Sequence, residues 1–362
     1  MWLAGAALAS WVGRNTITMR TWGIQLMVFG AAATGCLLSF LGCTDRRPPP
    51  PAAPVVYRTP PQPPPRTSVE SVAEVRFQNA DTTVLAMTRR GNSVFLTGRP
   101  FGFMRWDVGA NPESPRLTFA ASDDIVNFAP KGKWVVDWYA SGAVGILGSY
   151  GFLSGTSGMS VVDISSTSNP AEVLRIPDID PNSDKVGRDL AYVYKAIVPH
   201  PSLPVLYGFR EQDFVYTLSA GSGGVNITSK SAYGKSGEPV CCVRSAVIFG
   251  NRLFVAFLSR LVWFDISGGR LGSPGEFSEL QAANVTASDN LLYVQHEPNR
   301  GQPAGYGNPR GIYVFNLQGE NVDFIPLDVV ANQIIVDPTD SYLYVNSNNI
   351  TVDVFRINWA ER

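Results

Sequence analysis

Residues that serve metal, redox and acid–base chemistry are scarce in this sequence. Its 362 residues include two histidines and four cysteines. The patterns His-x-His, His-x-x-x-His and Cys-x-x-Cys-His do not occur, which argues against a zinc site, a c-type haem and a histidine-based hydrolase. His200, in a Pro-His-Pro triplet, and His296, after an apolar segment, are therefore expected to be ordinary surface histidines.

Charged residues are also few, and neither sign is in excess. They make up 16% of the chain, with 29 Lys and Arg against 30 Asp and Glu and a formal net charge of −1. A nucleic-acid-binding domain carries a basic stripe or patch that neutralises phosphates. No such run occurs in this sequence, so we expect no nucleic-acid partner. The 34 glycines and 27 prolines are instead typical of many strands joined by turns.

Six short segments share one pattern, in which an aromatic or β-branched residue is followed usually by Asp or Asn and then by Ile, Leu or Val. Their steps along the chain are 56, 54, 48, 51 and 40 residues, counted between Trp106, Val162, Tyr216, Phe264, Phe315 and Phe355. Around them, β-branched and aromatic runs alternate with turn residues. Self-similarity at this period in strand-like segments predicts the four-stranded blades of a β-propeller.

The number of strands predicts how the ring of blades closes. After the sixth segment only residues 358–362 remain, too few for an outer strand, whereas a spare strand-like segment, 72–77, precedes the first blade. Pairing 72–77 with 352–357 would complete the last blade and cover two exposed sheet edges. The sequence thus predicts an all-β fold over 68–362, a six-bladed β-propeller closed by an N-terminal strand.

Two repeats resemble repeats of known families. The segment that begins Met159-Ser-Val-Val-Asp-Ile resembles the LVIVD repeat of bacterial surface and periplasmic propellers, and 336–346 is similar to the YVTN-type repeat of lactonase-like propellers. The resemblance implies a bacterial β-propeller lipoprotein. It implies no catalytic residue, because these repeats are structural.

The first 42 residues have the composition of a secretory signal peptide. Arg14 and Arg20 precede the apolar stretch 22–41, and Cys43 follows Gly42 as in the lipobox of bacterial lipoproteins. In this interpretation Cys43 is lipidated and becomes the new N-terminus, and residues 1–18 are a start-site extension. The alternative is an uncleaved transmembrane anchor, since about 20 apolar residues can span a bilayer. Both interpretations place the propeller in the cell envelope, on the bacterial outer membrane or on the periplasmic or extracellular face.

A proline-rich linker joins the lipidated cysteine to the propeller, over residues 43–67. Ten prolines lie between Pro48 and Pro65. Proline at this density adopts the extended polyproline II conformation, so the linker would be a spacer of up to roughly 70 Å.

Cys241 and Cys242 are adjacent, and they are the thiols that remain once the signal peptide is removed and Cys43 is lipidated. Three interpretations stay open for this pair: a vicinal disulfide, two core thiols, or metal and redox chemistry with other ligands. An oxidising compartment favours disulfides in general.

Counting back from the aromatic residues of the second strands predicts a set of small or polar residues at the mouth of the central channel. The set is Thr83, Lys195, Cys242, Gln281 and Asn332. It has no carboxylate, whereas six-bladed hydrolases hold a metal at this place on Asp, Glu and Asn. Asp123, Asp124 and Asp189 are candidates for rim carboxylates, with solvated turn residues as the alternative.

These observations predict a function in binding. We expect a membrane-anchored binding or assembly module for an envelope or surface protein, with no catalytic residue, no metal and no cofactor. The alternative is a periplasmic lactonase-like hydrolase, or another hydrolase, that uses the central channel.

Overall fold

The computed structural model of the protein describes part of the chain. The described residues are 67–360, apart from 77–82, 100–101, 110, 121–142, 156–157, 166–170, 178–194, 210–213, 222–223, 233–242, 258–259, 278–279, 298–309, 328, 330 and 348–349.

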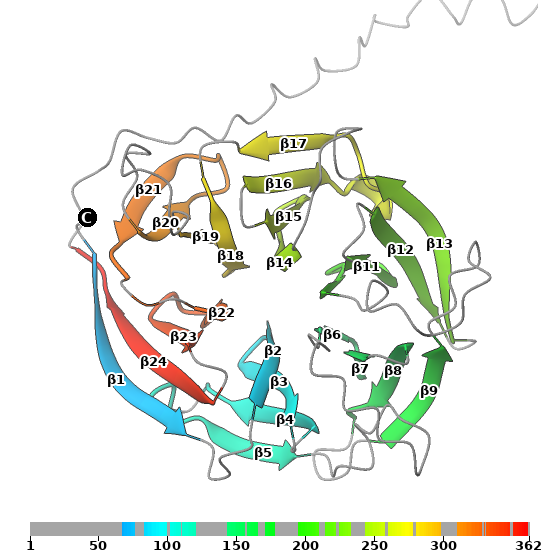
Figure 1. Cartoon of the computed structure of the whole chain (residues 1–362), viewed down its shortest axis with the longest axis horizontal. Coiled ribbons are helices and arrows are strands. Elements are labelled where there is room, and N and C mark those ends of the chain that lie inside the picture. Colours follow the sequence, from blue (N-terminus) through cyan, green and yellow to red (C-terminus); the bar gives the residue numbers. More distant parts are fainter. Residues whose placement is uncertain are drawn as a thin grey trace, which may run out of the picture. The chain divides into compact units, whose positions relative to one another are not determined.

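Six antiparallel sheets of four strands form a ring around a central axis (Figure 1). In five blades the chain runs from the axis outward, and in the sixth the outermost strand comes from the N-terminal end of the propeller. Blade 1 holds β2 (Thr83–Arg90), β3 (Ser93–Arg99), β4 (Gly102–Asp107) and β5 (Arg116–Ala120). In blade 2 the strands are β6 (Val144–Leu147), β7 (Tyr150–Gly155), β8 (Gly158–Asp163) and β9 (Ala171–Pro177). Blade 3 consists of β10 (Ala196–Pro199), β11 (Val205–Phe209), β12 (Phe214–Gly221) and β13 (Gly224–Ala232).

The other three blades follow the same plan. Blade 4 holds β14 (Val243–Phe249), β15 (Arg252–Phe257), β16 (Arg260–Asp265) and β17 (Pro274–Phe277), with the short 3-10 turn η2 (Ser267–Gly269) before β17. Blade 5 holds β18 (Ala282–Ala287), β19 (Leu292–His296), β20 (Gly311–Phe315) and β21 (Asn321–Ile325). Blade 6 is made of β22 (Gln333–Val336), β23 (Tyr342–Asn346), β24 (Thr351–Asn358) and β1 (Ser68–Arg76). The predicted six-bladed β-propeller is confirmed.

Hydrophobic clusters fill the six junctions between neighbouring blades. The aromatic residues of the second strands face the next blade: Tyr207 packs against blade 4 and Tyr344 against blade 1. The aromatic residues of the repeated pattern face the preceding blade, as Phe264 packs against blade 3 and Trp106 against blade 6. Each blade therefore buries both of its faces, so the apolar core is complete when the ring is closed.

Closure of the ring occurs in blade 6, at the strand pair β1 and β24 (Figure 1). The two strands run antiparallel from the pair Ser68 and Asn358 to the pair Arg76 and Thr351, with an irregularity at Val72. The predicted closure by the N-terminal strand is confirmed. Apolar side chains of β1 contribute to both neighbouring cores, since Val69 packs into the cluster between blades 5 and 6 and Val75 into the cluster between blades 6 and 1.

The Asp or Asn of the repeated pattern closes the turn between the third and fourth strands. In four blades its Oδ1 accepts a hydrogen bond at 2.8–3.0 Å from the backbone N–H two residues further on; these residues are Asp107, Asp163, Asp265 and Asn316. Such Asx turns let a short polar side chain replace a backbone turn bond. The sequence repeat is thus explained by turn geometry, which makes it a structural signal.

Two blades lack this residue for different reasons. In blade 3 the position is Thr217, and β12 continues beyond it to Gly221 with a bulge between Thr217 and Leu218. In blade 6 the position is Arg356, and no chain turn follows, because the fourth strand of this blade is β1.

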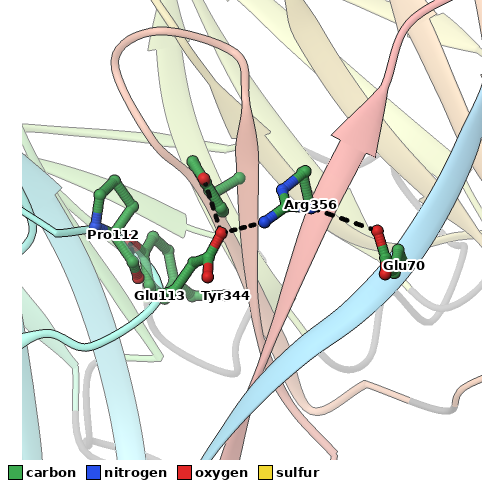
Figure 2. A network of polar contacts seen from close by, with 6 residues as sticks. Glu70, Pro112, Glu113, Tyr344 and Arg356 are labelled. Carbon is green, nitrogen blue, oxygen red and sulfur yellow. Dashed lines mark hydrogen bonds and ion pairs between the residues drawn. The ribbon is translucent and has the colours of Figure 1, made fainter.

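A polar network surrounds Arg356 at this point (Figure 2). Its guanidinium donates hydrogen bonds to Glu113, in the β4–β5 connection of blade 1, and to Oε2 of Glu70, on β1, at 3.3 Å. Close by, the hydroxyl of Tyr344 donates to the carbonyl of Pro112 at 3.0 Å. The network therefore joins the last strand of blade 6 to the closing strand and to blade 1.

Candidate functional site

The axis of the ring holds a cavity of about 100 Å³. Residues in or next to all six innermost strands form its wall, and the polar ones are Thr88, Arg89, Lys195, Ser245, Thr286 and Gln333. Among the lining residues that the structure describes, two carry a positive charge and none is an Asp or Glu. The cavity is therefore lined by cationic, hydroxyl and amide groups on an otherwise apolar wall.

Two of these polar side chains hold neighbouring innermost strands together. The Oγ of Ser245, on β14, accepts a hydrogen bond from the backbone N–H of Val285, on β18, at 2.7 Å. The Oε1 of Gln333, on β22, accepts one from the N–H of Met87, on β2, at 2.5 Å. Innermost strands have one edge without a strand partner, so these bonds satisfy backbone groups that the sheets leave unpaired.

Two buried asparagines add further bonds between blades. The Nδ2 of Asn284 donates to the carbonyl of Ala331 at 2.9 Å, and that of Asn346 donates to the carbonyl of Val84 at 3.1 Å. With Ser245 and Gln333, they connect blade 4 to blade 5, blade 5 to blade 6, and blade 6 to blade 1. The inner ring on this side is consequently held by side chain–backbone bonds as well as by apolar packing.

Arg89 lies at the end of β2, half-buried. Its guanidinium donates to the carbonyls of Gly91 and Ala287, each at 3.2 Å. Burial lowers its pKa, while three carboxylates near it, Asp289, Asp337 and Asp340, act in the opposite direction. Arg89 therefore connects blade 1 to blade 5 and places a positive charge close to acidic turns.

One of these three carboxyl groups, that of Asp340, also has a shifted pKa. Burial raises the pKa of Asp340, and its Oδ1 accepts a hydrogen bond from the hydroxyl of Tyr293 at 2.7 Å. Asp340 has a left-handed backbone, with φ of 58°, in the turn between β22 and β23. The N–H groups of Ser341 and Tyr342 donate to Oδ1 of Asp337 at 2.7 Å each, so this turn is tightly bonded.

The residues predicted to line the channel mouth take different positions. Lys195 lies on the cavity wall, half-buried, next to β10. Gln281 and Asn332 directly precede β18 and β22, where their backbone N–H groups donate to His296 Nδ1 at 3.1 Å and to the Asn346 carbonyl at 2.7 Å. Thr83 is the first residue of β2. The structure brings Lys195 together with Ser245 and Gln333, and a binding role for the predicted set stays a prediction.

Counting along the sequence missed Ser245, Thr286 and Gln333. Three innermost strands contain an irregularity close to their start, between Val84 and Ala86, between Val243 and Ser245, and between Ala282 and Asn284. A bulge inserts one residue and shifts which side chains reach the axis. The sequence did offer a signal for these three residues, since each is a polar residue in a mostly apolar innermost strand.

The expectation of surface histidines is wrong. His200 is 8% exposed and His296 is 1% exposed. The Nδ1 of His200 accepts hydrogen bonds from the N–H groups of Ser202 and Leu203, at 3.2 and 3.1 Å, and burial lowers its pKa. The ring of His296 meets Tyr313 edge-on, with centroids 5.8 Å apart. His200 lies in the turn after β10, and His296 is the last residue of β19, where it pairs with Ala282 and Gly311. Both histidines are therefore buried parts of the propeller.

Several predicted residues lie outside the described part of the chain. They are Cys43, Cys241, Cys242, Asp123, Asp124 and Asp189. Within the described residues, no group of three or more His, Cys, Asp or Glu is arranged to hold a metal ion. A search of the same residues finds no helix with the length and apolar character needed to cross a membrane.

Comparison with known proteins supports the fold. No protein-family model matches the chain, and no curated protein matches it. Solved structures do match: U3-55K is 9% identical with a TM-score of 0.52, and the match covers 79% of this chain and 99% of that one. The WD40 repeats of RRP9 are 10% identical with a TM-score of 0.51, over 80% of this chain and 100% of that one. At such identities the likeness shows the fold alone, a β-propeller.

Proposed function

We propose that the protein is a lipid-anchored β-propeller of the bacterial cell envelope that binds a protein partner. The sequence supports the anchor through its apolar segment, the Gly-Cys pair ending at Cys43 and the proline-rich linker. The resemblance of 159–164 to the LVIVD repeat supports the same compartment. The propeller fold supports a binding role, because a rigid ring of blades offers broad surfaces for partners.

The observation that carries the proposal is the way in which the linker enters the ring. Thr67, the last linker residue, is 1% exposed, and its Oγ1 donates to Oδ2 of Asp323 on β21 at 2.5 Å. The next residue begins β1, the strand that completes blade 6. The proline-rich linker thus leads directly into a strand that the propeller needs for its fold. A lipid anchor at Cys43 would therefore keep the propeller, and any partner bound to it, at the membrane.

The repeated residues also support a scaffold. The aromatic residues fill the junctions between blades, and the Asp and Asn residues close turns. Since these residues are used by the fold, partner recognition would depend on residues that differ from blade to blade.

The second candidate function is a lactonase-like hydrolase that uses the central cavity. The cavity itself is the observation that favours it, because enzymes with this architecture act at the axis. The lining residues that the structure describes supply Lys195, Arg89 and hydroxyl groups, and none supplies the carboxylate that a metal-dependent hydrolase of this kind would use.

Replacement of Cys43 by Ser tests the anchor. We expect wild type to incorporate a fatty-acid analogue during growth and Cys43→Ser to lose both this label and cleavage after Gly42, because acylation requires the thiol. Cys36→Ser is the matched control, since Cys36 lies within the signal and would be removed with it. Label retained in Cys43→Ser, or residues 19–42 retained in mature wild type, would establish the transmembrane anchor instead.

The binding role has a separate test. Cross-linking in intact cells, followed by purification of the solubilised protein, should recover one envelope protein in wild type. Purified propeller, residues 67–362, should then bind that protein directly and compete with the anchored form. Hydrolysis of lactones by the purified propeller, with no direct binding of a protein, would favour the second candidate.

A further inference from the structure

The turn between β10 and β11 in blade 3 is built around the side chain of His200. Its Nδ1 atom accepts hydrogen bonds from the backbone N–H groups of Ser202 and Leu203, at 3.2 and 3.1 Å. The backbone closes the same turn, since the N–H of His200 donates to the carbonyl of Val205 at 2.8 Å. A ring nitrogen that accepts a hydrogen bond carries no proton, so the proton of the neutral ring is on Nε2. The turn therefore requires the neutral form of this histidine.

The other side of the ring connects this turn to blade 4. His200 is hydrogen-bonded to the backbone of Ile266, and in the neutral tautomer the Nε2–H is the donor to that carbonyl. Leu203, in the same turn, lies against η2, because a Cβ added at Gly269 would be 3.0 Å from Cδ1 of Leu203. The imidazole thus holds a turn of blade 3 in place at the junction with blade 4.

The corresponding turns of blades 5 and 6 use acceptors of a different kind. In blade 5 the Oγ of Ser288 accepts hydrogen bonds from the N–H groups of Asn290 and Leu291, at 3.2 and 3.0 Å. In blade 6 the carboxylate of Asp337 has this role. A hydroxyl and an ionised carboxylate both remain acceptors in mild acid. An imidazole does not, because both of its ring nitrogens are donors once the ring is protonated.

Three titratable side chains belong to the described chain segments that contact the ring, which are β11 and the residues around Ile266. The ring of Tyr207, on β11, lies with its centroid 6.3 Å from that of His200, and burial raises the pKa of Tyr207 to about 12, so its hydroxyl stays neutral. Asp265 and Arg270 are both exposed, and the carboxylate of Asp265 is engaged in the turn after β16. Among the described residues, burial has the largest effect on the pKa of His200 and lowers it, while the bond to Ile266 acts in the opposite direction.

We propose that His200 is a pH-sensitive switch that releases the turn 200–205 from blade 4 in mild acid. Protonation at Nδ1 converts an acceptor into a donor that faces the N–H groups of Ser202 and Leu203, so both hydrogen bonds are lost. The turn then moves away from η2 and exposes the side chain of Leu203 at the junction of blades 3 and 4. This inference goes beyond the proposed function and depends neither on the anchor nor on the protein partner.

Hydrogen exchange of the full chain, corrected for the intrinsic effect of pH on exchange, tests the switch between about pH 7.5 and about pH 4.5, a range that spans the usual pKa of histidine. In wild type the amides of Ser202 and Leu203 should exchange about tenfold faster or more at the acid end, as expected for the loss of two hydrogen bonds. The turn of blade 5 is the internal control. The amides of Asn290 and Leu291 should keep their protection, because the hydroxyl of Ser288 does not titrate in this range.

The sign of the effect follows from the direction of the pKa shift. Burial lowers the pKa of His200 below its usual 6.5, so the neutral ring stabilises the turn above that pH. This stability is lost as pH falls through the folded pKa. An NMR titration of the His200 ring should therefore have its midpoint below 6.5, at the same pH as the change in exchange.

His200→Asn separates protonation of the ring from other effects of acid. The side-chain oxygen of Asn can accept the same two N–H groups, as in an Asx turn, and the amide does not titrate. We expect the acid-induced rise in exchange to disappear in this variant, whereas any effect of acid through His296 would remain. His200→Ser, which copies the Ser288 turn of blade 5, is the second variant and serves if His200→Asn does not fold.

Three results would overturn the proposal. The first is equal protection of Ser202 and Leu203 across the pH range in folded wild type. The second is an acid-induced rise that is as large in His200→Asn or His200→Ser as in wild type, because the ring would then not be the group responsible. The third is an equal rise in the turn of blade 5, which would mean that acid loosens these turns in general.

Discussion

Blade 4 and blade 6 carry the same repeated pattern, but their outer strands are attached in different ways. In blade 4, Asp265 follows Phe264 and closes the turn that leads through η2 to β17. In blade 6, Arg356 follows Phe355, and the outer strand comes from the other end of the chain. A short covalent turn holds one outer strand, while pairing, packing and a charged network hold the other.

The difference between the two blades shows that the repeated Asp fixes the turn before the outer strand. Its Oδ1 accepts hydrogen bonds from the N–H of Ser267 at 2.9 Å and from the Ser267 hydroxyl at 2.6 Å, which fixes the start of the turn. Where no turn exists, Asp has no such partner, and Arg356 at the same position reaches Glu113 and Glu70. The closing strand must therefore be held without the help of a nearby covalent connection, and its pairing closes a loop almost as long as the chain.

Deletion of the closing strand β1 should have the largest effect on the stability of the propeller. Removing residues 1–80 deletes β1, whereas removing residues 1–66 leaves it. We expect the longer deletion to lower the free energy of unfolding by about 5 kcal/mol, since Val69, Val72 and Val75 each contribute roughly 1–2 kcal/mol when buried and an outer strand is lost. The shorter deletion should match the full propeller.

Urea unfolding followed by circular dichroism measures this difference, and failure of the longer deletion to yield soluble protein while the shorter one is soluble counts as the same result. Equal unfolding midpoints for the two deletions would show that β1 contributes nothing to closure.

A smaller effect is expected from an overpacked outer strand in blade 4. A Cβ added at Gly275, on β17, would lie 2.1 Å from Cζ2 of Trp263. The guanidinium of Arg252 lies over the same ring, 4.4 Å from its centre. The ring cannot move away easily, so Gly275→Ala should cost about 1–3 kcal/mol. Gly151→Ala, whose Cβ would meet Phe103 at an ordinary 3.4 Å, is the control.

Thermal unfolding of both variants tests this. The loss of unfolding free energy in Gly275→Ala should be smaller than the loss caused by deleting β1, because the turn at Asp265 keeps β17 next to β16. A larger loss in Gly275→Ala than in the deletion would contradict the view that the covalent turn protects blade 4.

Much of this architecture could be predicted from the sequence, because the repeat reports strand and turn positions directly. The spacing from Trp106 to Phe355 gives six blades, and the spare segment 72–77 gives the closure. The number of blades and the closing strand could both be predicted because they depend on strand and turn patterns formed by residues close together in the chain. The role of the Asp in the turn is equally local, since its partner is two residues away.

Contacts between distant residues could not be predicted in the same way. Arg356 was visible as a departure from Asp, but Glu113 is 243 residues away in the chain. Ser245 follows a bulge near the start of β14, and Gln333 bonds a backbone N–H of the neighbouring blade. The burial of His200 depends on the packing of a turn. These features follow from how the blades meet, which a one-dimensional pattern does not record.

The smallest expected effect on stability concerns two carboxyl groups, that of Glu113 beside Arg356 and that of Asp265 in the turn of blade 4. Hydrogen bonds from Arg356 and then from Tyr342 lower the pKa of Glu113 below its usual 4.5, and the hydroxyl and N–H of Ser267 lower that of Asp265. A carboxyl whose folded pKa is lowered stabilises the fold above its unfolded pKa, and this stability is lost as pH falls through the folded pKa. Glu113→Gln should therefore lower the unfolding midpoint at pH 7 and match wild type in acid.

Salt distinguishes the ion pair from the turn. Glu113 and Arg356 are both partly exposed, with 35% and 40% of their side-chain surface accessible, so about 1 M salt should shrink the effect of Glu113→Gln by screening. Asp265→Asn is the comparison in blade 4, where an amide oxygen can still accept the Ser267 N–H, as Asn316 does from Gln318 in blade 5. We expect this variant to stay close to wild type in urea unfolding at pH 7, with little response to salt. A loss in Asp265→Asn greater than in Glu113→Gln, or a Glu113→Gln effect unchanged by salt, would mean that charge does not hold the closing strand.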